Sequence, residues 1–426
     1  MRTSRLLRTL PALAVAATLA VAAPLAAGPA GADPTTAPTS GLTIPTTTTA
    51  QECPYRVGTP PPVDESEVVA PGQTTPTPLP VPDPPIGGGR LGECGLVADP
   101  AAGAIPPRLT SEGWLIADLE TGDVIAAQDP HGRFRPASTI KILLALVALE
   151  ELDLDTPLEV NANDWSMEGD SCGVGPGGKY TTRDIVTGLL VVSGNDCANA
   201  LARELGGYDE TLEKMNAKAE ALGALDTRAA TPSGLDSAGM SSSPYDLAVI
   251  FRAGMANQEF ADMLALKNYE FPGYPARKDI PGDEDKPAYL MGTSNTLLRD
   301  GVPGMTVLGG KTGYTDDALK TFVGAAEKDG RQLVIVQMYG LSEPDSSYHD
   351  QAVALLEYGF AADPSISVGT LNNEAAQRET DSGAPSAESG SDSVAMGALP
   401  LILVGVLLLT AASLVVMAIR QHRRRR

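Results

Sequence analysis

Two β-hairpin patterns lie at opposite ends of the segment between residues 108 and 360. The first joins residues 114–118 to residues 124–127, and the second joins residues 321–326 to residues 332–338, in both cases across a turn that contains glycine. Strands at both ends with helices between them predict an α+β fold, in which one antiparallel sheet is built from both ends of the segment. The helical patterns run over residues 182–190, 196–205, 211–222 and 245–255.

Residues 1–32 have the pattern of a secretory signal peptide. Three arginines precede an apolar run over residues 10–27, and the small residues Ala-Gly-Ala follow at 30–32. We therefore expect cleavage before Asp33 and export of the rest of the chain. The alternative is an uncleaved N-terminal anchor.

The C-terminal part has the pattern of a membrane anchor. Residues 361–393 are acidic and rich in serine and glycine, which predicts a disordered tether. Residues 394–419 carry no charge and are long enough to span a bilayer, and the basic tail 420–426 predicts a cytoplasmic C-terminus. We expect a single-pass protein of the cell membrane whose folded domain lies outside the cytoplasm. The alternative for the apolar segment is a buried globular helix.

Residues 33–107 are dominated by proline, threonine and glycine, which predicts an extended, polyproline-like arm before the folded domain. The chain has four cysteines, and in an oxidising compartment an even number suggests disulfides, here with three possible pairings. We expect Cys53 to pair with Cys94, closing the arm into a loop on the domain, and Cys172 to pair with Cys197. The cysteine spacing does not resemble that of a metal site, and we expect no metal.

The net charge of the exported part argues against a nucleic-acid partner. Without the three arginines before residue 33 and the five after residue 419, residues 33–393 carry 23 basic and 53 acidic side chains, a net charge of about −30. Such a surface repels a phosphate backbone.

Ser138 and Lys141 stand three residues apart at the head of a strongly apolar run that continues to Glu150. Residues at this spacing share one face of a helix, and burial of the lysine disfavours its charged form and lowers its pKa. A neutral amine beside a hydroxyl is a general base beside a nucleophile. The alternative is a serine that faces solvent and a lysine that extends its amine to the surface.

Ser193 and Asn195 stand two residues apart around a glycine, between two helical patterns. This spacing puts a hydroxyl and an amide on one tight loop, where they can hand on a proton and hold a peptide group. In the alternative interpretation, Asn195 and Asp196 are ordinary caps of the following helix.

Lys311, Thr312 and Gly313 lie in a predicted strand that is entered through two glycines. The lysine supplies a fixed positive charge and the threonine a hydroxyl, a combination suited to a carboxylate. Gly313 lets a substrate backbone come close to the strand. The alternative is a common turn.

The three motifs SxxK, SxN and KTG occur in this order, with Ser193 55 positions after Ser138 and Lys311 118 positions after Ser193. They form the signature set of penicillin-binding proteins and serine β-lactamases. Over about residues 110–360 the chain resembles the low-molecular-mass D-alanyl-D-alanine carboxypeptidases of the membrane-anchored actinobacterial type. The blocks that carry the resemblance lie at residues 136–141, 189–196, 231–236, 242–248 and 310–315.

The resemblance implies a fold and a set of catalytic roles. The fold would be that of β-lactamases and penicillin-binding proteins, a five-stranded antiparallel sheet flanked by helices, with a mainly helical insertion. Ser138 would attack the penultimate D-Ala carbonyl and form an acyl-enzyme, with Lys141 taking its proton. Ser193 would relay that proton to the leaving D-Ala, and Asn195 would hold the peptide on the acyl side.

The KTG strand would bind the other end of the substrate. Lys311 and Thr312 would receive the terminal carboxylate, and the backbone N–H groups of Ser138 and Tyr314 would stabilise the oxyanion. The resemblance implies no cofactor. The partners it implies are peptidoglycan stem peptides ending in D-Ala-D-Ala and the β-lactams that imitate them, and it places the catalytic domain facing the cell wall.

The chain departs from the family pattern at several points. Ala318 and Leu319 stand where Ala-Gly is common, and we expect this change to alter the wall of the cleft. Gly310 stands where a branched apolar residue is usual. We also expect one catalytic domain over residues 108–360, with no second β-rich domain, and a true membrane span in place of an amphipathic anchor.

Three functions fit the motifs. The leading one is a D,D-carboxypeptidase, with D,D-endopeptidase activity on cross-links as an extension. A serine β-lactamase is the runner-up, but the glutamate loop that hydrolyses its acyl-enzyme has no match between Asn195 and Lys311. A slow penicillin-binding sensor or wall-binding protein is the third, and the tail 420–426 is too short for a signalling domain.

Overall fold

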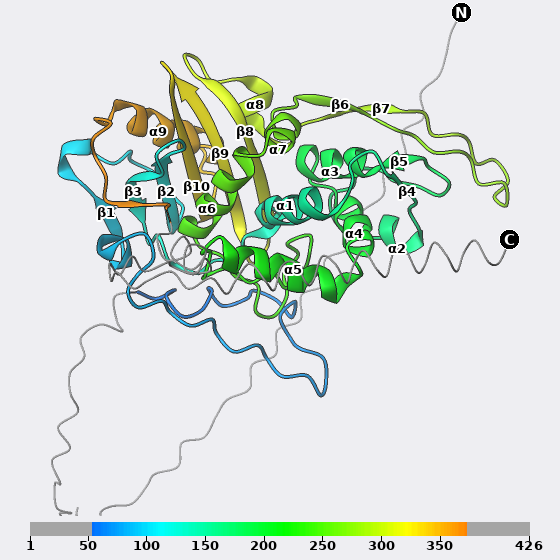
Figure 1. Ribbon diagram of the computed structural model, residues 1–426, viewed down its shortest axis with the longest axis horizontal. Helices are drawn as coiled ribbons and strands as arrows, with labels where there is room; N and C mark the ends of the chain where they lie inside the picture. The colour runs from blue at the N-terminus through cyan, green and yellow to red at the C-terminus, as the bar shows by residue number, and fades with distance from the viewer. Residues whose placement is uncertain (1–52, 373–426) are drawn as a thin grey trace, which may run out of the picture. The chain divides into compact units, whose positions relative to one another are not determined.

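A computed structural model describes residues 53–372 (Figure 1). At its centre is an antiparallel sheet of seven strands in the order β1-β3-β2-β10-β9-β8, with β11 paired to β3 beside β1. The strands are β1 (Leu96–Ala98), β2 (Gly113–Asp118), β3 (Asp123–Gln128), β8 (Thr306–Thr315), β9 (Leu319–Lys328), β10 (Arg331–Gly340) and β11 (Gly369–Thr370).

The five central strands confirm the predicted sheet, and the two hairpin patterns are β2–β3 and β9–β10. The two ends of the domain meet where β2 pairs with β10, with Leu115 opposite Val336 and Ile116 opposite Ile335. The sheet exceeds the predicted five strands because two short strands, β1 and β11, add to the outer edge of β3. Both lie outside the expected boundaries of the domain, in the predicted arm and the predicted tether, whose amino-acid compositions do not predict strands.

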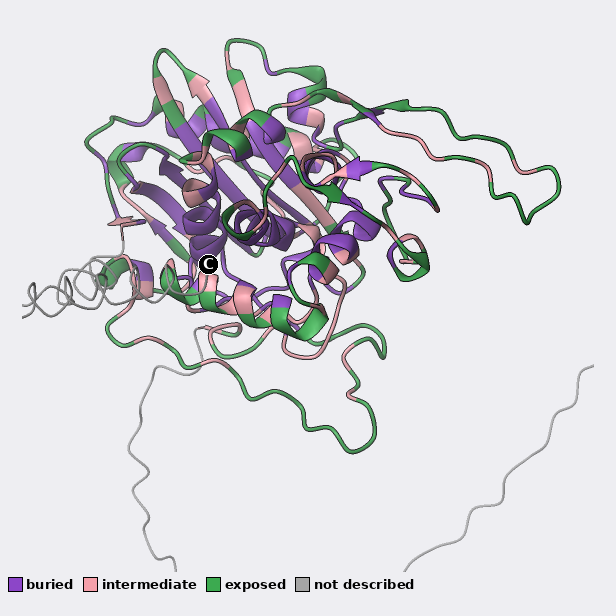
Figure 2. Cartoon of the chain, turned by 45° about the vertical axis from the view of Figure 1, so that its right-hand side comes forward, coloured by how far each residue is buried: buried purple, intermediate pink, exposed green. Residues whose placement is uncertain are grey.

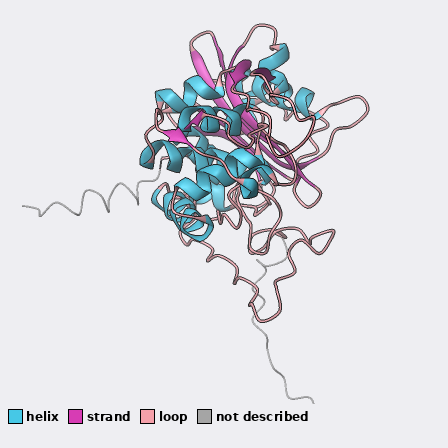
Figure 3. Cartoon of the chain, turned by 90° about the vertical axis from the view of Figure 1, so that its right-hand side faces the viewer, coloured by secondary structure: helices cyan, strands magenta, loops and turns pink. Residues whose placement is uncertain are grey.

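Helices cover both faces of the sheet (Figure 3). Successive residues of a strand point to opposite faces, so Leu115 joins the core beneath α1 and α6 while Ile116 joins the core beneath α9. The helices are α1 (Lys141–Glu151), α2 (Ala162–Trp165), α3 (Thr182–Val191), α4 (Asn195–Glu204), α5 (Tyr208–Ala221), α6 (Pro244–Met255), α7 (Gln258–Leu264), α8 (Thr296–Asp300) and α9 (Tyr348–Ala361).

The predicted helices are α3, α4, α5 and α6. The predicted helical insertion is present, with α2 among its helices. It also contains the short hairpin of β4 (Pro157–Leu158) and β5 (Tyr180–Thr181). A second hairpin, β6 (Asn268–Phe271) and β7 (Tyr289–Gly292), projects from the domain and was not predicted (Figure 1).

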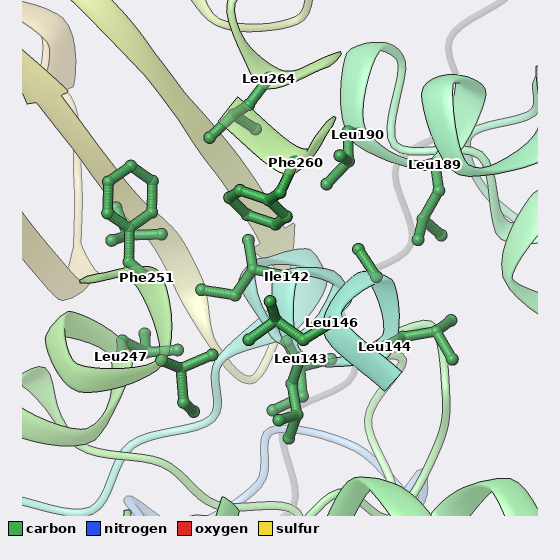
Figure 4. Close-up of a cluster of buried hydrophobic side chains, with 14 of the residues drawn as sticks. Ile142, Leu143, Leu144, Leu146, Leu189, Leu190, Leu247, Phe251, Phe260 and Leu264 are labelled. Atoms are coloured by element: carbon green, nitrogen blue, oxygen red, sulfur yellow. The ribbon is translucent and has the colours of Figure 1, made fainter. Parts of the chain in front are cut away.

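Helix α1 is the central helix of the larger core. Its residues from Lys141 to Ala148 are all buried, and Figure 4 shows its leucine and isoleucine side chains among those of α3, α6 and α7. A helix that is apolar all round must be surrounded by protein, which explains the absence of an amphipathic pattern. Figure 2 shows the same burial along α1 and the central strands.

The α-helix begins later than the apolar run suggested. Ser138 lies in the 3-10 turn η3 (Ala137–Ile140), and α1 begins at Lys141. Ala137 has a φ of 47°, in the left-handed region, which cannot be part of an α-helix. The spacing argument still holds, because side chains three apart in a 3-10 turn also lie above one another.

The folded unit extends beyond the expected limits of residues 108 and 360. The described part of the arm is irregular, yet it contributes β1, a 3-10 turn at Gly89–Gly92 and the fully buried Leu91. After α9, Val368 and Leu371 are buried against the larger core. The arm is therefore packed on the domain, and the expected tether begins with folded residues.

Both predicted disulfides are present. Cys53 is bonded to Cys94, with 5.4 Å between their Cα atoms, and Cys172 to Cys197, with 6.3 Å. The signal peptide at residues 1–32, the start of the arm, the span at 394–419 and the tail at 420–426 lie outside the described residues. Within residues 53–372, no helix has the length and apolar character needed to cross a membrane.

Packing of the arm predicts a specific loss of stability. Leu91 is completely buried beside Gly87 and Gly369, so we expect Leu91→Ala to lower the free energy of unfolding by about 2–5 kcal/mol. Leu96 of β1 is 52% exposed, and Leu96→Ala should change it by less than about 0.5 kcal/mol. Urea unfolding followed by circular dichroism measures both. Equal effects would contradict a packed arm.

Candidate active site

Ser138 is held in a strained turn at the entrance to α1. The preceding Ala137 is buried with a positive φ, and the carbonyl of Pro136 accepts hydrogen bonds from Thr139 Oγ1 at 2.6 Å and from Thr321 Oγ1 of β9 at 2.8 Å. Strained backbone persists where the surroundings over-determine it, and it concentrates at functional sites. Ser138 is half-buried at the wall of a cavity.

Lys141 is completely buried beneath Ser138. Its Nζ lies 2.7 Å from Ser138 Oγ, 2.7 Å from Asn195 Oδ1 and 2.6 Å from the carbonyl of Ser233. Burial lowers the pKa of Lys141 well below its usual value, nearby Lys311 lowers it further, and Asp170 opposes the shift. A neutral amine can donate to the two carbonyl oxygens and accept the proton of Ser138.

Ser193, in the turn between α3 and α4, and Asn195, the first residue of α4, reach the same cavity. Asn195 accepts from Lys141 through Oδ1, donates from Nδ2 to the carbonyl of Glu168 at 2.5 Å and donates from its backbone N–H to the carbonyl of Asp170. Ser193 has a φ of 67°, and its buried Oγ has no hydrogen-bond partner among residues 53–372. The hydroxyl is thus free to bond a bound substrate.

Asp196 does not cap α4 through its side chain, as the alternative interpretation required, because the N-cap is Gly194. Its buried carboxylate instead accepts from Ser171 Oγ at 2.6 Å and from the backbone N–H groups of Cys172, Gly173 and Val174. With the Cys172–Cys197 disulfide, these bonds fix the segment that places Asp170 at the cavity wall.

Lys311 is completely buried in β8, and its Nζ donates to the carbonyl of Thr312 at 2.6 Å. Burial lowers the pKa of Lys311 to about 7, with Asp170 opposing the shift. The positive charge predicted for Lys311 is therefore only partly present near pH 7 in the free protein. Thr312 Oγ1 lies 3.1 Å from Ser294 Oγ, on the side of β8 that faces α8.

Gly313 lies where β8 approaches η3. A Cβ atom at this position would be 2.9 Å from the backbone nitrogen of Ser138, so only glycine fits. Tyr314, the next residue, is 57% exposed, and its hydroxyl donates to Asp316 at 2.9 Å. The structure thus brings the end of the KTG strand beside the backbone of the nucleophile, which is the arrangement an oxyanion site requires.

These groups share one cavity of about 770 Å³. Ser138, Ser193, Asn195, Thr312, Gly313 and Tyr314 line it, and both buried lysines lie behind its wall. The cavity also has polar lining residues that the motifs did not indicate, because they lie outside the three motifs and form no recognisable pattern in the sequence. They include Asp170, Ser294, Thr296, Asp300, Lys320 and His349.

The structure explains one departure from the family pattern and describes the backbone at a second. At Gly310, a Cβ atom would lie 2.8 Å from the carbonyl oxygen of Val323 and 3.0 Å from Asn295 Nδ2, so the space of a side chain is occupied. Leu319 has a φ of 53°, a conformation that favours glycine. The expectation that Ala318 and Leu319 alter the wall of the cleft is wrong, because neither lines the cavity, whereas Lys320 does.

Comparison with known proteins agrees with this site. The Peptidase S11 pattern, D-alanyl-D-alanine carboxypeptidase, matches residues 101–341. The carboxypeptidase DacB2 of Mycobacterium tuberculosis is 49% identical over 274 residues, which are 63% of this chain and 89% of the relative. The carboxypeptidase DacF of Bacillus subtilis is 29% identical over 255 residues, and the match spans 58% of this chain and 61% of the relative.

Solved structures give the same result. The crystal structure of a D-alanyl-D-alanine carboxypeptidase from Mycobacterium tuberculosis is 47% identical, with a TM-score of 0.57, over 63% of this chain and 98% of that one. The Streptomyces K15 DD-transpeptidase is 25% identical, with a TM-score of 0.54, over 61% of this chain and all of that one. The resemblance drawn from the motifs is confirmed: this chain belongs to the D-alanyl-D-alanine carboxypeptidase family.

Proposed function

We propose that the D-Ala-D-Ala carboxypeptidase activity of this protein proceeds through an acyl-enzyme on Ser138. The observation that carries the proposal is the 2.7 Å hydrogen bond between Ser138 Oγ and the Nζ of a completely buried lysine, Lys141. Burial lowers the pKa of Lys141 and so favours its neutral form, and a neutral amine can accept a proton. The substrate is a peptidoglycan stem peptide that ends in D-Ala-D-Ala.

In the acylation step, Ser138 Oγ attacks the penultimate D-Ala carbonyl carbon while its proton moves to Lys141. The oxyanion accepts from the backbone N–H groups of Ser138 and Tyr314. When the tetrahedral intermediate collapses, the peptide C–N bond breaks and the leaving nitrogen receives a proton through Ser193. The buried hydroxyl of Ser193 lies at the cavity and bonds no group of residues 53–372, which leaves it available for this relay. Water then attacks the Ser138 ester and releases the shortened peptide.

The terminal carboxylate binds at Thr312 and Lys311, opposite Ser294. A carboxylate beside Lys311 stabilises its protonated form, so binding and protonation of Lys311 favour each other. On the acyl side, Asn195 holds the peptide. β-Lactams occupy the same site and acylate Ser138.

We also propose that the protein is exported and anchored in the cell membrane, with its catalytic domain facing the cell wall. The signal-peptide and span patterns at residues 1–32 and 394–419 support this. So do the two disulfides, because such bonds persist in oxidising compartments.

Replacing the nucleophile tests the proposal directly. In the full-length protein, we expect Ser138→Ala to reduce D-alanine release from a D-Ala-D-Ala peptide by at least about 1,000-fold and to abolish covalent labelling by a fluorescent penicillin. The control is Ser365→Ala, an exposed serine outside the cavity, which should change neither signal. Labelling of the parent without D-alanine release would favour a sensor, and rapid penicillin hydrolysis would favour a β-lactamase.

The pKa of about 7 for Lys311 predicts how substrate binding depends on pH. Below this pKa Lys311 is charged and attracts the carboxylate, and above it the charge is lost. We therefore expect KM to rise above pH 7, by up to about tenfold per pH unit. A substrate whose terminal carboxylate is replaced by an amide is the control, and its KM should change little. Parallel pH profiles for the two substrates would contradict the role of Lys311.

A second activity, cleavage of cross-links, is favoured by the shape of the cavity. Beyond Thr312 it continues between β9, α8 and α9, where Thr296 Oγ1 lies 2.7 Å from His349 Nδ1. Thr312 is the proposed site of the leaving residue's carboxylate, so this extension lies on the leaving-group side. It provides space for a leaving group larger than D-alanine, such as the diamino acid of a second stem peptide.

The extension predicts that His349→Ala lowers cleavage of a cross-linked stem-peptide dimer more than it lowers release of D-alanine. We expect about a tenfold difference, the size of one lost hydrogen bond to a charged group. Glu357→Ala, on the exposed side of α9, is the matched control and should affect neither reaction. Mass spectrometry of the products measures both. Absence of dimer cleavage by the active parent would reject this second activity.

A further inference from the structure

The segment that leads into the nucleophile is anchored to the N-terminal arm. Arg133, only 1% exposed, donates to the carbonyl oxygens of Val57, Leu79 and Pro80 at 3.0, 2.6 and 2.7 Å. It also pairs with the buried carboxylate of Asp226 at 3.0 Å. Three acceptors from the arm on one buried guanidinium make this contact specific, because a bare guanidinium in the interior is costly.

Arg135 makes a second contact with the arm. It is also 1% exposed, donates to the carbonyl of Pro60 at 2.7 Å and forms an ion pair with Glu67. Arg135 stands three residues before Ser138. Its contacts with the arm therefore restrain the chain a short stretch of backbone before the strained turn η3.

The same stretch of the arm also holds the end of the KTG strand. Asp317, 2% exposed, follows the last residue of β8 by two positions. Its carboxylate accepts from the backbone N–H of Val63 at 2.5 Å and from Ser66 Oγ at 2.9 Å. Residues 60–67 thus contact both Arg135, before the nucleophile, and Asp317, after the KTG strand.

The arm thus joins η3, which carries Ser138, to β8, which carries the KTG motif. The distance between these two elements matters for catalysis. The site for a Cβ atom on Gly313 lies 2.9 Å from the backbone nitrogen of Ser138, and Thr321 of β9 bonds the carbonyl of Pro136. The proposed oxyanion site lies between η3 and β8. A displacement of about 1 Å between catalytic groups can cost about 100-fold in rate.

We propose that residues 60–67 of the arm form a positioning clamp, in which Glu67 through Arg135 and Ser66 through Asp317 hold η3 against β8. The clamp lies before residue 101, where the family pattern begins to match, so it is a feature of this chain outside the matched region. Glu67 and Ser66 act through other residues and do not line the cavity. The inference rests on the proposed acyl-enzyme function, because the rate it affects is the acylation of Ser138.

The test compares two carboxylates of the arm in the full-length protein. Glu67→Gln removes the charge that pairs with Arg135, and Glu65→Gln is the matched control, since Glu65 is exposed two residues away. We expect Glu67→Gln to lower the acylation rate constant with a fluorescent penicillin, and kcat for D-alanine release, by about tenfold, with KM nearly unchanged. Glu65→Gln should match the parent, and Glu67→Asp should recover part of the rate.

Thermal unfolding separates positioning from a merely structural role. Rates are measured at a temperature where each variant is fully folded. If the clamp only stabilises the fold, Glu67→Gln lowers Tm but leaves the acylation rate of the folded protein unchanged. That result, or equal rates for Glu67→Gln and Glu65→Gln, would overturn the proposal. If Glu67→Gln does not fold, Ser66→Ala decides, because it removes only the hydroxyl that bonds Asp317 and should slow acylation several-fold. A parent without activity would instead refute the proposed function.

Discussion

The structure depends on the burial of Lys141 in the centre of the larger core. A lysine in this position must lose its charge or find compensation, and the surroundings provide three oxygen partners and lower its pKa. These partners come from η3, from the start of α4 and from the loop containing Ser233. The domain must therefore bring three distant parts of the chain together before the base exists. The active site is therefore part of the hydrophobic core.

The groups around this lysine are held by rigid and partly strained structure. Ala137 and Ser193 both have positive φ values, which non-glycine residues rarely adopt. Asp196 fixes the facing wall through a group of hydrogen bonds, and the Cys172–Cys197 disulfide reinforces it. Such preorganisation suits a reaction in which donors must already point at the developing oxyanion. The contacts of residues 60–67 with Arg135 and Asp317 join the arm to the same rigid structure from outside the matched family region.

The arm shows where composition misleads. A segment rich in proline and threonine cannot form its own core, and this reasoning holds for the described residues, which contain only short elements. Composition does not predict whether the segment packs on the surface of a neighbouring domain. Arg133 and Arg135 provide that surface by offering buried donors to backbone carbonyls, which are present in any sequence. Local patterns contain no sign of such contacts, because the partners are more than fifty residues apart.

The sequence by itself determined the α+β class, the two terminal hairpins and the three motifs, because each depends on local spacing, and it limited the disulfides to three possible pairings. Tertiary structure decided the rest. It placed Lys311 in an environment that lowers its pKa to about 7, extended the cavity to His349 and added two strands to the sheet. These properties come from burial and from contacts between distant segments, and neither is encoded in any short stretch of residues.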